Sequence, residues 1–563
     1  MTQDVSPQHP ESVLGDFANR EYRYGDTTTT MSRDAAGRFI MTFANVGAGA
    51  SPGESPVVAA IVRAVGSHRY QQYLADVGGV LWRLPMAYHV EERRWFPMNA
   101  AFLTSDPERF DAGTSVVAGQ PGQPRQPTFG GGAFDRHVTR WNDNCVFCHN
   151  VAPNPGRDPA TGTFQTSVAE LGIACEACHG PADEHVRANQ SVLRRIALRD
   201  ATVADPTITN PARLSPSRSA DVCGRCHGQR LTDDVGPFLA RGDPFVPGDD
   251  LGLYSAPLWQ DTPLHGDPRA FAPRFWDDGT PRLTAYEYQG WLQSPCAQRG
   301  ALTCTTCHSM HAGNPSGQVR PEARGDAACT SCHQSLSTPA AKSAHARHDA
   351  GDSGVRCVSC HMPRVVYGVM DVHISHRIEV PDPAAAVHAG RPDACTLCHV
   401  DKDRAWAARS WAVLWPQRAT PGHATVPDDD DLAPLGALFS GDPIARAVAA
   451  RALGDAPLVT KAGPPGNASE RQGALLSAMA EDRYPAVRRL AARALSRLLS
   501  NSDAESAARA RNFDATAPVR TRQADLQYLG NALPEAQRWR ATHEARRMRL
   551  RNTGQTRDID IGE

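Results

Sequence analysis

The sequence predicts an α+β protein with much irregular structure, arranged as a small N-terminal antiparallel β subdomain, a cysteine-rich middle domain and a C-terminal α-solenoid. Three observations lead to this prediction. The chain has no cysteine before residue 145 and carries β-rich runs there, its middle repeats one short cysteine motif, and its last third contains an alanine-rich helical repeat. Glycine and proline number 46 and 44 among 563 residues, which favours irregular segments.

The N-terminal subdomain is expected over residues 13–110. The run EYRYGDTTTTMSRDAAGRFIMTF predicts two strands around a turn from Asp34 to Gly37, and GGVLWRLPMAYHVEERRWFPM predicts two more. A connector rich in glycine, proline and glutamine follows between Thr104 and Phe134. We therefore expect a small antiparallel sheet ahead of the first cysteine.

The pentapeptide Cys-x-x-Cys-His occurs seven times and uses 14 of the 15 cysteines. Thiols three residues apart lie on one side of a helical turn, where they can form thioethers to the two vinyl groups of one porphyrin. The adjacent histidine can then bind the iron through a neutral imidazole nitrogen. Zinc knuckles and disulfides, the alternatives, do not require a histidine after every second cysteine. The motifs therefore predict seven covalently bound c-type haems.

The motifs define a multihaem cytochrome c domain expected over residues 135–404. The expected attachment cysteines are Cys145, Cys148, Cys175, Cys178, Cys223, Cys226, Cys304, Cys307, Cys329, Cys332, Cys357, Cys360, Cys395 and Cys398. The expected proximal iron ligands are His149, His179, His227, His308, His333, His361 and His399. Motifs four to seven follow one another closely, which predicts neighbouring haems that can conduct electrons.

An alanine-rich repeat follows the last cysteine. The stretch DPIARAVAARAL begins at Asp442 and recurs as YPAVRRLAARAL from Tyr484, 42 residues later. This offset falls within the period of roughly 40 to 47 residues that is typical of HEAT-type helical pairs. We expect HEAT-like repeats over residues 432–500 and a charged helical tail over 501–563. A chance match of two alanine-rich amphipathic helices is the alternative.

Each iron needs either a second axial ligand or an open position, and this choice separates an electron carrier from an enzyme. The histidines that fall inside or beside the dense cluster are His311, His345, His348, His373, His376 and His388, and His185 follows the second motif. Met310 and Met362 lie too close to their own motifs to serve as distal ligands. Coordination by two histidines would keep the potentials low relative to His/Met sites.

Several segments resemble multihaem cytochromes of the cytochrome c-552/4 domain type, namely ELGIACEACHGPADEHV, YQGWLQSPCAQRGALTCTTCHSMH, HARHDAGDSGVRCVSCHMPRVVYG and ISHRIEV. Such proteins are often fused to HEAT or tetratricopeptide repeats and are related to tetrahaem electron-transfer cytochromes and octahaem hydroxylamine oxidoreductases. The resemblance implies distal ligands at His68, His185, His311, His345, His348 and His376. His373 and His388 do not fall on family positions. The remaining cysteine, Cys296, lies in a family-like SPC segment as a buried thiol or a haem-facing one.

The resemblance also implies an eighth haem motif and a secretion signal ahead of the VLGDF segment, so we expect both upstream of residue 1. Haem c is attached outside the cytoplasm, which predicts a periplasmic or extracellular protein. No stretch approaches the roughly 18 apolar residues of a membrane span.

The leading functional prediction is an electron-transfer cytochrome that relays electrons through bis-His haems to redox protein partners. One alternative is a haem oxidoreductase that acts on a small nitrogen or sulfur compound at a five-coordinate iron. The absence of a Cys-x-x-Cys-Lys motif excludes a lysine-ligated haem in this sequence. Another alternative is a scaffold that docks to a redox complex through its repeats. The protein charge of −2, made more negative by haem propionates, argues against nucleic acid as a partner.

Overall fold

The computed structural model describes residues 2–45, 55–106, 125–199, 203–311, 317–349, 356–418, 426, 433–456 and 468–554. The chain forms two compact units. The first unit consists of Met1–Met98, Phe110–Leu258 and Arg299–Val319, and the second of Asn99–Arg109, Trp259–Gln298 and Arg320–Glu563.

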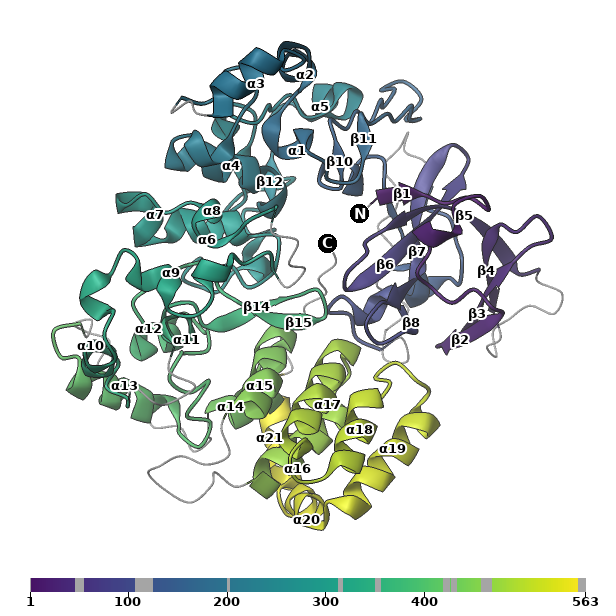
Figure 1. Cartoon of the computed structure of the whole chain (residues 1–563). Helices are drawn as coiled ribbons and strands as arrows, with labels where there is room; N and C mark the ends of the chain where they lie inside the picture. Colours follow the sequence, from purple (N-terminus) through teal and green to yellow (C-terminus); the bar gives the residue numbers. More distant parts are fainter. Residues whose placement is uncertain are drawn as a thin grey trace. The chain divides into compact units, whose positions relative to one another are not determined.

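A nine-stranded antiparallel sheet dominates the N-terminal part of the first unit (Figure 1). Its strands are β1 (Thr2–Asp4), β2 (Arg20–Tyr24), β3 (Thr27–Arg33), β4 (Phe39–Asn45), β5 (Val57–Val65), β6 (Tyr70–Val77), β7 (Val80–His89), β8 (Arg94–Pro97) and β9 (Thr139–Arg140). Strands β2 to β8 pair in sequence order, β1 pairs with β5, and β9 pairs with β7. The predicted N-terminal antiparallel sheet is confirmed.

The hairpin β3–β4 forms around the predicted turn, where the Gly37 N–H donates to the Asp34 carbonyl over 2.9 Å. Both strands bury every second residue, and Met31 lies opposite Met41 in the core of the sheet. This alternation is the period of two that a half-buried strand requires. The strands expected between residues 78 and 98 are β7 and β8.

The sheet is larger than the sequence indicated, because the first predicted strand divides into β2 and β3, and β5 and β6 lie between the two predicted pairs. The pairing register shifts between Ile61 and Arg63 in β5 and between Gln72 and Leu74 in β6. Such irregularities interrupt the alternation of buried and exposed residues along a strand. The hydrophobic pattern of β5 and β6 therefore did not predict strands.

Short elements separated by irregular chain carry the cysteine motifs. The helices are α1 (Glu176–His179), α2 (Asp183–Ala188), α3 (Val192–Arg199), α4 (Pro216–His227), α5 (Val235–Arg241), α6 (Glu287–Gln293), α7 (Pro295–Arg299), α8 (Cys304–Cys307), α9 (Ala327–Thr330), α10 (Pro339–Ala346), α11 (Cys357–His361), α12 (Pro383–His388) and α13 (Arg404–Leu414). The strands are β10 (Asn150–Val151), β11 (Glu170–Leu171), β12 (Arg230–Leu231), β13 (Ala256–Pro257), β14 (Arg364–Gly368) and β15 (Asp371–Ile374).

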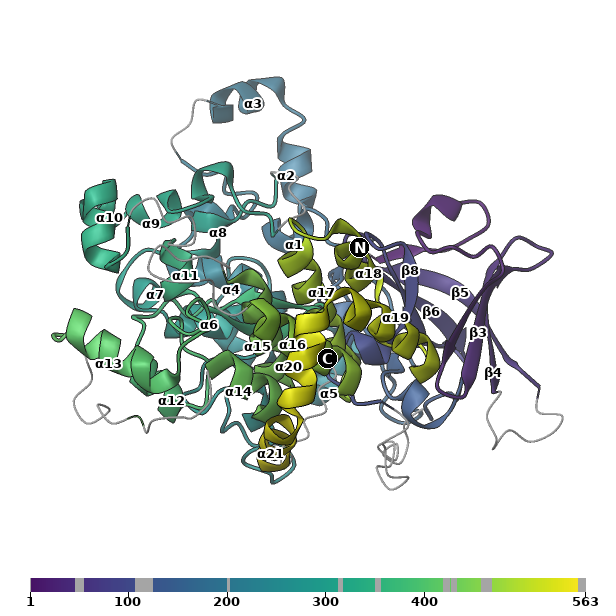
Figure 2. The same cartoon turned by 90° about the horizontal axis from the view of Figure 1, so that it is seen from below.

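The C-terminal part of the second unit is helical (Figure 2). Its helices are α14 (Ala433–Ser440), α15 (Pro443–Asp455), α16 (Ala468–Glu481), α17 (Pro485–Leu499), α18 (Ala504–Asn512), α19 (Val519–Ala532), α20 (Pro534–Thr542) and α21 (Glu544–Gly554). Within the described residues, no helix is both long and apolar enough to span a bilayer.

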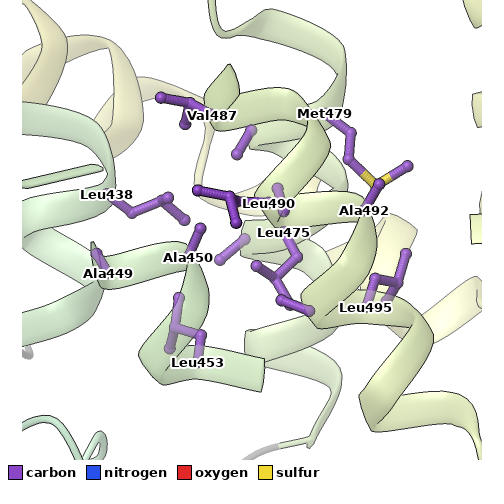
Figure 3. Packing of buried hydrophobic residues seen from close by; sticks show 14 of the residues in the cluster. Leu438, Ala449, Ala450, Leu453, Leu475, Met479, Val487, Leu490, Ala492 and Leu495 are labelled. Carbon is purple, nitrogen blue, oxygen red and sulfur yellow. The ribbon is translucent and has the colours of Figure 1, made fainter. Parts of the chain in front are cut away.

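The repeated sequence forms α15 and α17, which pack directly against each other. Each begins with proline at its first turn, where the missing N–H costs no hydrogen bond. A Cβ at Gly454 would lie only 2.6 Å from the Cα of Ala494, so glycine is needed where the two helices cross. Figure 3 shows Leu453, Leu475 and Leu490 meeting in the buried cluster between these helices and α16. The assignment of the pair as a HEAT-like solenoid stays a prediction.

A buried ion pair joins the helical part to a distant segment of the same unit. Arg488 on α17 is 1% exposed, and its guanidinium contacts the Asp106 carboxylate at 2.8 Å. The backbone N–H of Asp106 also donates to the Arg483 carbonyl over 2.8 Å. These contacts hold together two segments whose residues, Asp106 and Arg488, are 382 positions apart in the sequence.

Replacing Arg488 with methionine should destabilise the second unit by about 3 kcal/mol, because the Asp106 carboxylate, only 15% exposed, loses its main cation. Among the described residues, Arg522 at 3.6 Å is the cation that would remain beside Asp106. The matched control is Arg538→Met, which breaks an ion pair with Glu535 whose side chains are 71% and 64% exposed, and should cost less than about 1 kcal/mol. Denaturant unfolding of both variants measures the difference, and equal losses would contradict the role of Arg488.

Candidate haem-binding sites

Each cysteine motif lies in a helical or turn-like stretch of backbone, and the third motif forms the last turn of the longer helix α4. The histidine N–H donates to the carbonyl of the first cysteine, over distances from 2.8 Å at His399 and Cys395 to 3.3 Å at His149 and Cys145. In the seventh motif the Asp393 carboxylate caps this turn by accepting from the Thr396 N–H over 2.8 Å. The turn places both thiols on one side of the backbone.

The first four motifs lie in the first unit and the last three in the second. Inside each unit, thiols of different motifs lie close together. The first unit brings Cys148 into contact with Cys226, and Cys223 into contact with Cys304. In the second unit Cys329 contacts Cys357, and Cys360 lies near Cys398.

Burial makes three of the motif thiols poor anions, whereas the hydrogen bond with Cys148 lowers the pKa of Cys226. Burial is the main reason why the pKa of Cys178 and that of Cys360 are both raised to about 11. Burial likewise raises the pKa of Cys357, to about 12. These side chains are therefore neutral at physiological pH before any thioether forms.

Several histidines are oriented by a hydrogen bond from Nδ1 to a backbone carbonyl. His179 bonds the Thr209 carbonyl at 2.6 Å and His361 the Glu379 carbonyl at 2.7 Å. Because a carbonyl oxygen only accepts, Nδ1 must carry the proton in each ring. The lone pair of Nε2 is then free to bind a metal ion.

Two further histidines make the same hydrogen bond from Nδ1 to a backbone carbonyl. The motif histidine His308 bonds the Gly317 carbonyl at 2.7 Å, and His348 bonds the Ala346 carbonyl at 2.6 Å. This hydrogen bond therefore orients both motif histidines and a predicted distal ligand.

Three motif histidines face a histidine that the sequence predicts as a distal ligand. His179 and His311 lie in the first unit, with ring centroids 6.0 Å apart and ring planes 5° apart. In the second unit the pair His345 and His361 has the same separation and an angle of 16°.

His348 and His399 form the third pair, also at 6.0 Å, with an angle of 35° between the rings. Two imidazoles on opposite sides of one iron, with metal–nitrogen bonds of about 2 Å, place their centroids roughly 6 Å apart. The residues present therefore fit a haem held between two imidazoles. Among the described residues, no group of three or more histidine, cysteine or acidic side chains comes together as a metal site.

Two of the paired imidazoles, His345 and His399, have a lowered pKa, which favours the neutral form that binds iron. Burial lowers the pKa of His345, and the neighbouring His361 lowers it further. Burial and His348 lower the pKa of His399 in the same way.

The other predicted distal ligands lie in different surroundings. His185, on α2, has its Nδ1 3.2 Å from the Asp205 carboxylate, which Arg194 also contacts at 2.8 Å. His68 is exposed at the turn between β5 and β6. Within the described residues of the first unit, no motif histidine ring lies against either of these two. Their roles as ligands stay predictions.

His376 follows β15, and its carbonyl accepts a hydrogen bond from the Ser294 hydroxyl over 3.0 Å. His373 uses its Nε2 to bond the Gly368 carbonyl at 2.8 Å within its own hairpin. His388 lines a cavity of about 610 Å³ together with Arg377 and Arg391. Ligation by His376 stays a prediction, and so do the sixth ligands of the motifs at His149, His227, His308 and His333.

Sequence reasoning missed the residues that orient the imidazoles. Thr209 lies 30 residues from His179, and Glu379 lies 18 residues from His361. They act through their backbone carbonyls, so their side chains carry no signal in the sequence. Asp205 could have been suspected only as a carboxylate near a histidine, a common arrangement.

The segment 320–349, which carries the fifth motif and both His345 and His348, has no buried residue. Ordering a chain costs about 1–2 kcal/mol per residue, which apolar burial normally offsets. Haem packing against this segment would supply the missing apolar contacts.

Haem-free protein should therefore be cut by trypsin within this segment, at Arg324, Lys342 or Arg347, whereas the haem-loaded protein resists. Limited proteolysis with mass spectrometry measures this. Helices α15 to α17, with their own aliphatic core, should stay intact in both forms and provide the internal control. Equal cleavage of segment 320–349 in both forms would contradict the inference.

Replacing His311 with alanine should convert one haem from low-spin to high-spin, because His179 loses the imidazole opposite it. Covalent haem should be unchanged. Low-temperature EPR and haem staining under denaturing conditions measure the two quantities. His9→Ala is the control, since this exposed histidine pairs only with Glu11 in the described chain, and an unchanged spectrum for His311→Ala would remove it from the ligand set.

Comparison with known proteins gives limited matches. Residues 294–338, which contain the fourth and fifth motifs, match the family described as the doubled CXXCH motif. A solved structure titled "Crystal Structure of Outer Cell Wall Cytochrome OcwA" is 15% identical, with a TM-score of 0.40, over 83% of this chain and 88% of that chain. No curated protein matches the chain. The repeated motifs and the doubled-motif match together support a multihaem c-type cytochrome that binds haem c covalently.

Proposed function

We propose that this protein relays electrons through haem c groups, one at each of the seven motifs, with two histidines as axial ligands. When bound, haem c supplies the one-electron chemistry, and His/His ligation favours low potentials relative to His/Met. The chain holds, orients and spaces these groups.

The observation that carries this proposal is the set of imidazole pairs at 6.0 Å. Occupied axial positions favour electron transfer over substrate chemistry, because they leave no open site at the iron. His311, His345 and His348 are the proposed partners of the second, sixth and seventh motifs. His68, His185 and His376 are proposed for motifs whose partners are still unassigned.

The thiol contacts supply an order for the haems inside each unit. In the first unit, the thiols of the third motif lie against Cys148 of the first and Cys304 of the fourth. Cys178 of the second motif is close to the same thiols. We therefore infer that the third haem is a junction with three neighbours. In the second unit, contacts of the sixth motif with the fifth and seventh imply the linear order five, six, seven.

Redox proteins are the proposed partners, because electrons must enter and leave the chain of haems. The HEAT-like helices are a proposed docking element for such a partner. Covalent haem attachment takes place outside the cytoplasm, so the proposed location is periplasmic or extracellular.

Purified, secreted protein should stain for covalent haem and exceed the mass of the bare chain by seven haems. The dithionite-reduced protein should show low-spin spectra, and ferric EPR should lack a high-spin signal that exchanges with added ligand. A stoichiometric, exchangeable high-spin signal would instead indicate an open iron and a catalytic site. A colourless protein would remove the proposal altogether.

A further inference from the structure

One short segment provides the partner histidines of two different motifs. Helix α10 ends at Ala346, with His345 in its last turn, and His348 follows Arg347, whose φ of 56° lies in the left-handed region. His345 faces His361 of the sixth motif, and His348 faces His399 of the seventh. Any displacement of α10 would therefore move both imidazoles.

Packing does not hold α10 in place, because none of its residues is buried. Its first turn is capped by the Thr338 hydroxyl, which accepts from the Ala341 N–H over 3.2 Å. At its other end Trp415 donates from Nε1 to the His345 carbonyl over 3.1 Å. Between the two ends, Lys342 provides the charged contact of the helix.

Lys342 pairs with the carboxylate of Asp326, a residue that accepts hydrogen bonds from the backbone of two motifs. Its Nζ lies 3.0 Å from Asp326 Oδ2, and the two side chains are 35% and 18% exposed. Asp326 Oδ1 accepts from the N–H of Cys357, the first residue of the sixth motif, over 3.0 Å. The Asp326 carbonyl accepts from the N–H of Cys329 in the fifth motif over 2.9 Å.

We propose that the ion pair of Asp326 and Lys342 is a tether that positions α10, so that one contact controls axial ligation at both the sixth and the seventh motif. Asp326 and Lys342 are positioning residues, since they act through His345 and His348. This inference rests on the proposed function, because it takes the two imidazole pairs as iron ligands.

This ion pair differs from an ordinary surface ion pair because it sets the position of two imidazoles. Exposed pairs change stability little. Here the carboxylate is already fixed by the Cys357 N–H beside His361, and the ammonium lies one turn before His345. A small shift in the position of α10 therefore changes the approach of two imidazoles to their irons.

The test measures carbon monoxide binding to the reduced holoprotein, since carbon monoxide can bind only after a distal histidine leaves the iron. Lys342→Met should accelerate binding at two haems, each by up to roughly fivefold, the equilibrium change expected from losing such a pair. His345→Ala and His348→Ala should each open one haem fully and so identify the two kinetic phases. Asp326→Asn, which keeps an acceptor for the Cys357 N–H, should behave like Lys342→Met.

Two controls isolate the ion pair. Lys342→Arg retains the charge and should restore slow binding at both haems. Glu322→Gln removes an exposed contact with Arg320 on the same segment, at 3.7 Å, and should leave both rates unchanged.

Unchanged rates in Lys342→Met would overturn the tether. Faster binding at one haem alone would show that the ion pair does not control both sites. Loss of covalent haem from Lys342→Met or Asp326→Asn would contradict a role confined to ligand positioning. If His345→Ala and His348→Ala leave carbon monoxide binding unchanged, the ligand assignment of the proposed function fails instead.

Discussion

The hydrogen bond from an imidazole Nδ1 to a backbone carbonyl is the interaction on which the candidate haem sites depend. It assigns the proton to Nδ1, leaves Nε2 with a free lone pair, and sets the plane of the ring. The acceptors at Thr209 and Glu379 lie in irregular chain outside the motifs. The path of these connecting segments therefore decides where the imidazoles point, which gives the irregular chain a function in a protein with few long elements in its middle.

The molecule combines two kinds of packing. The sheet and the C-terminal helices each have an aliphatic and aromatic core, with side chains such as Met31, Phe43 and Leu490 almost fully buried. The segment 320–349 contains no buried residue at all. Porphyrins are large apolar surfaces, and bound haem would give this segment the interior that its own side chains lack. We therefore expect haem binding and folding to be coupled in this segment.

Ion pairs integrate the C-terminal helices with the cysteine-rich chain of the second unit. Arg451 on α15 contacts the Asp371 carboxylate of the β14–β15 hairpin at 2.7 Å, and Arg488 on α17 contacts Asp106. The hairpin residues Tyr367 and Val372 also belong to the same buried cluster as these helices. The helical part is thus built into the unit that holds the last three motifs, and a docking role for it would act on the haem sites directly.

The sequence by itself determined the attachment chemistry, because thioether formation to one porphyrin needs only two thiols and a histidine on one helical turn, a spacing visible in five consecutive residues. It also predicted the hairpin at Asp34 to Gly37 and the helices of the alanine-rich repeat, since both follow from local periodicity. Only the tertiary structure decided that His311 faces His179 and that His345 and His348 face the histidines of two successive motifs. It alone also revealed Asp326 and the carbonyl acceptors, and it corrected the size of the sheet, where register shifts hide β5 and β6. Those features depend on contacts between segments far apart in the chain, and such contacts leave no local pattern in the sequence.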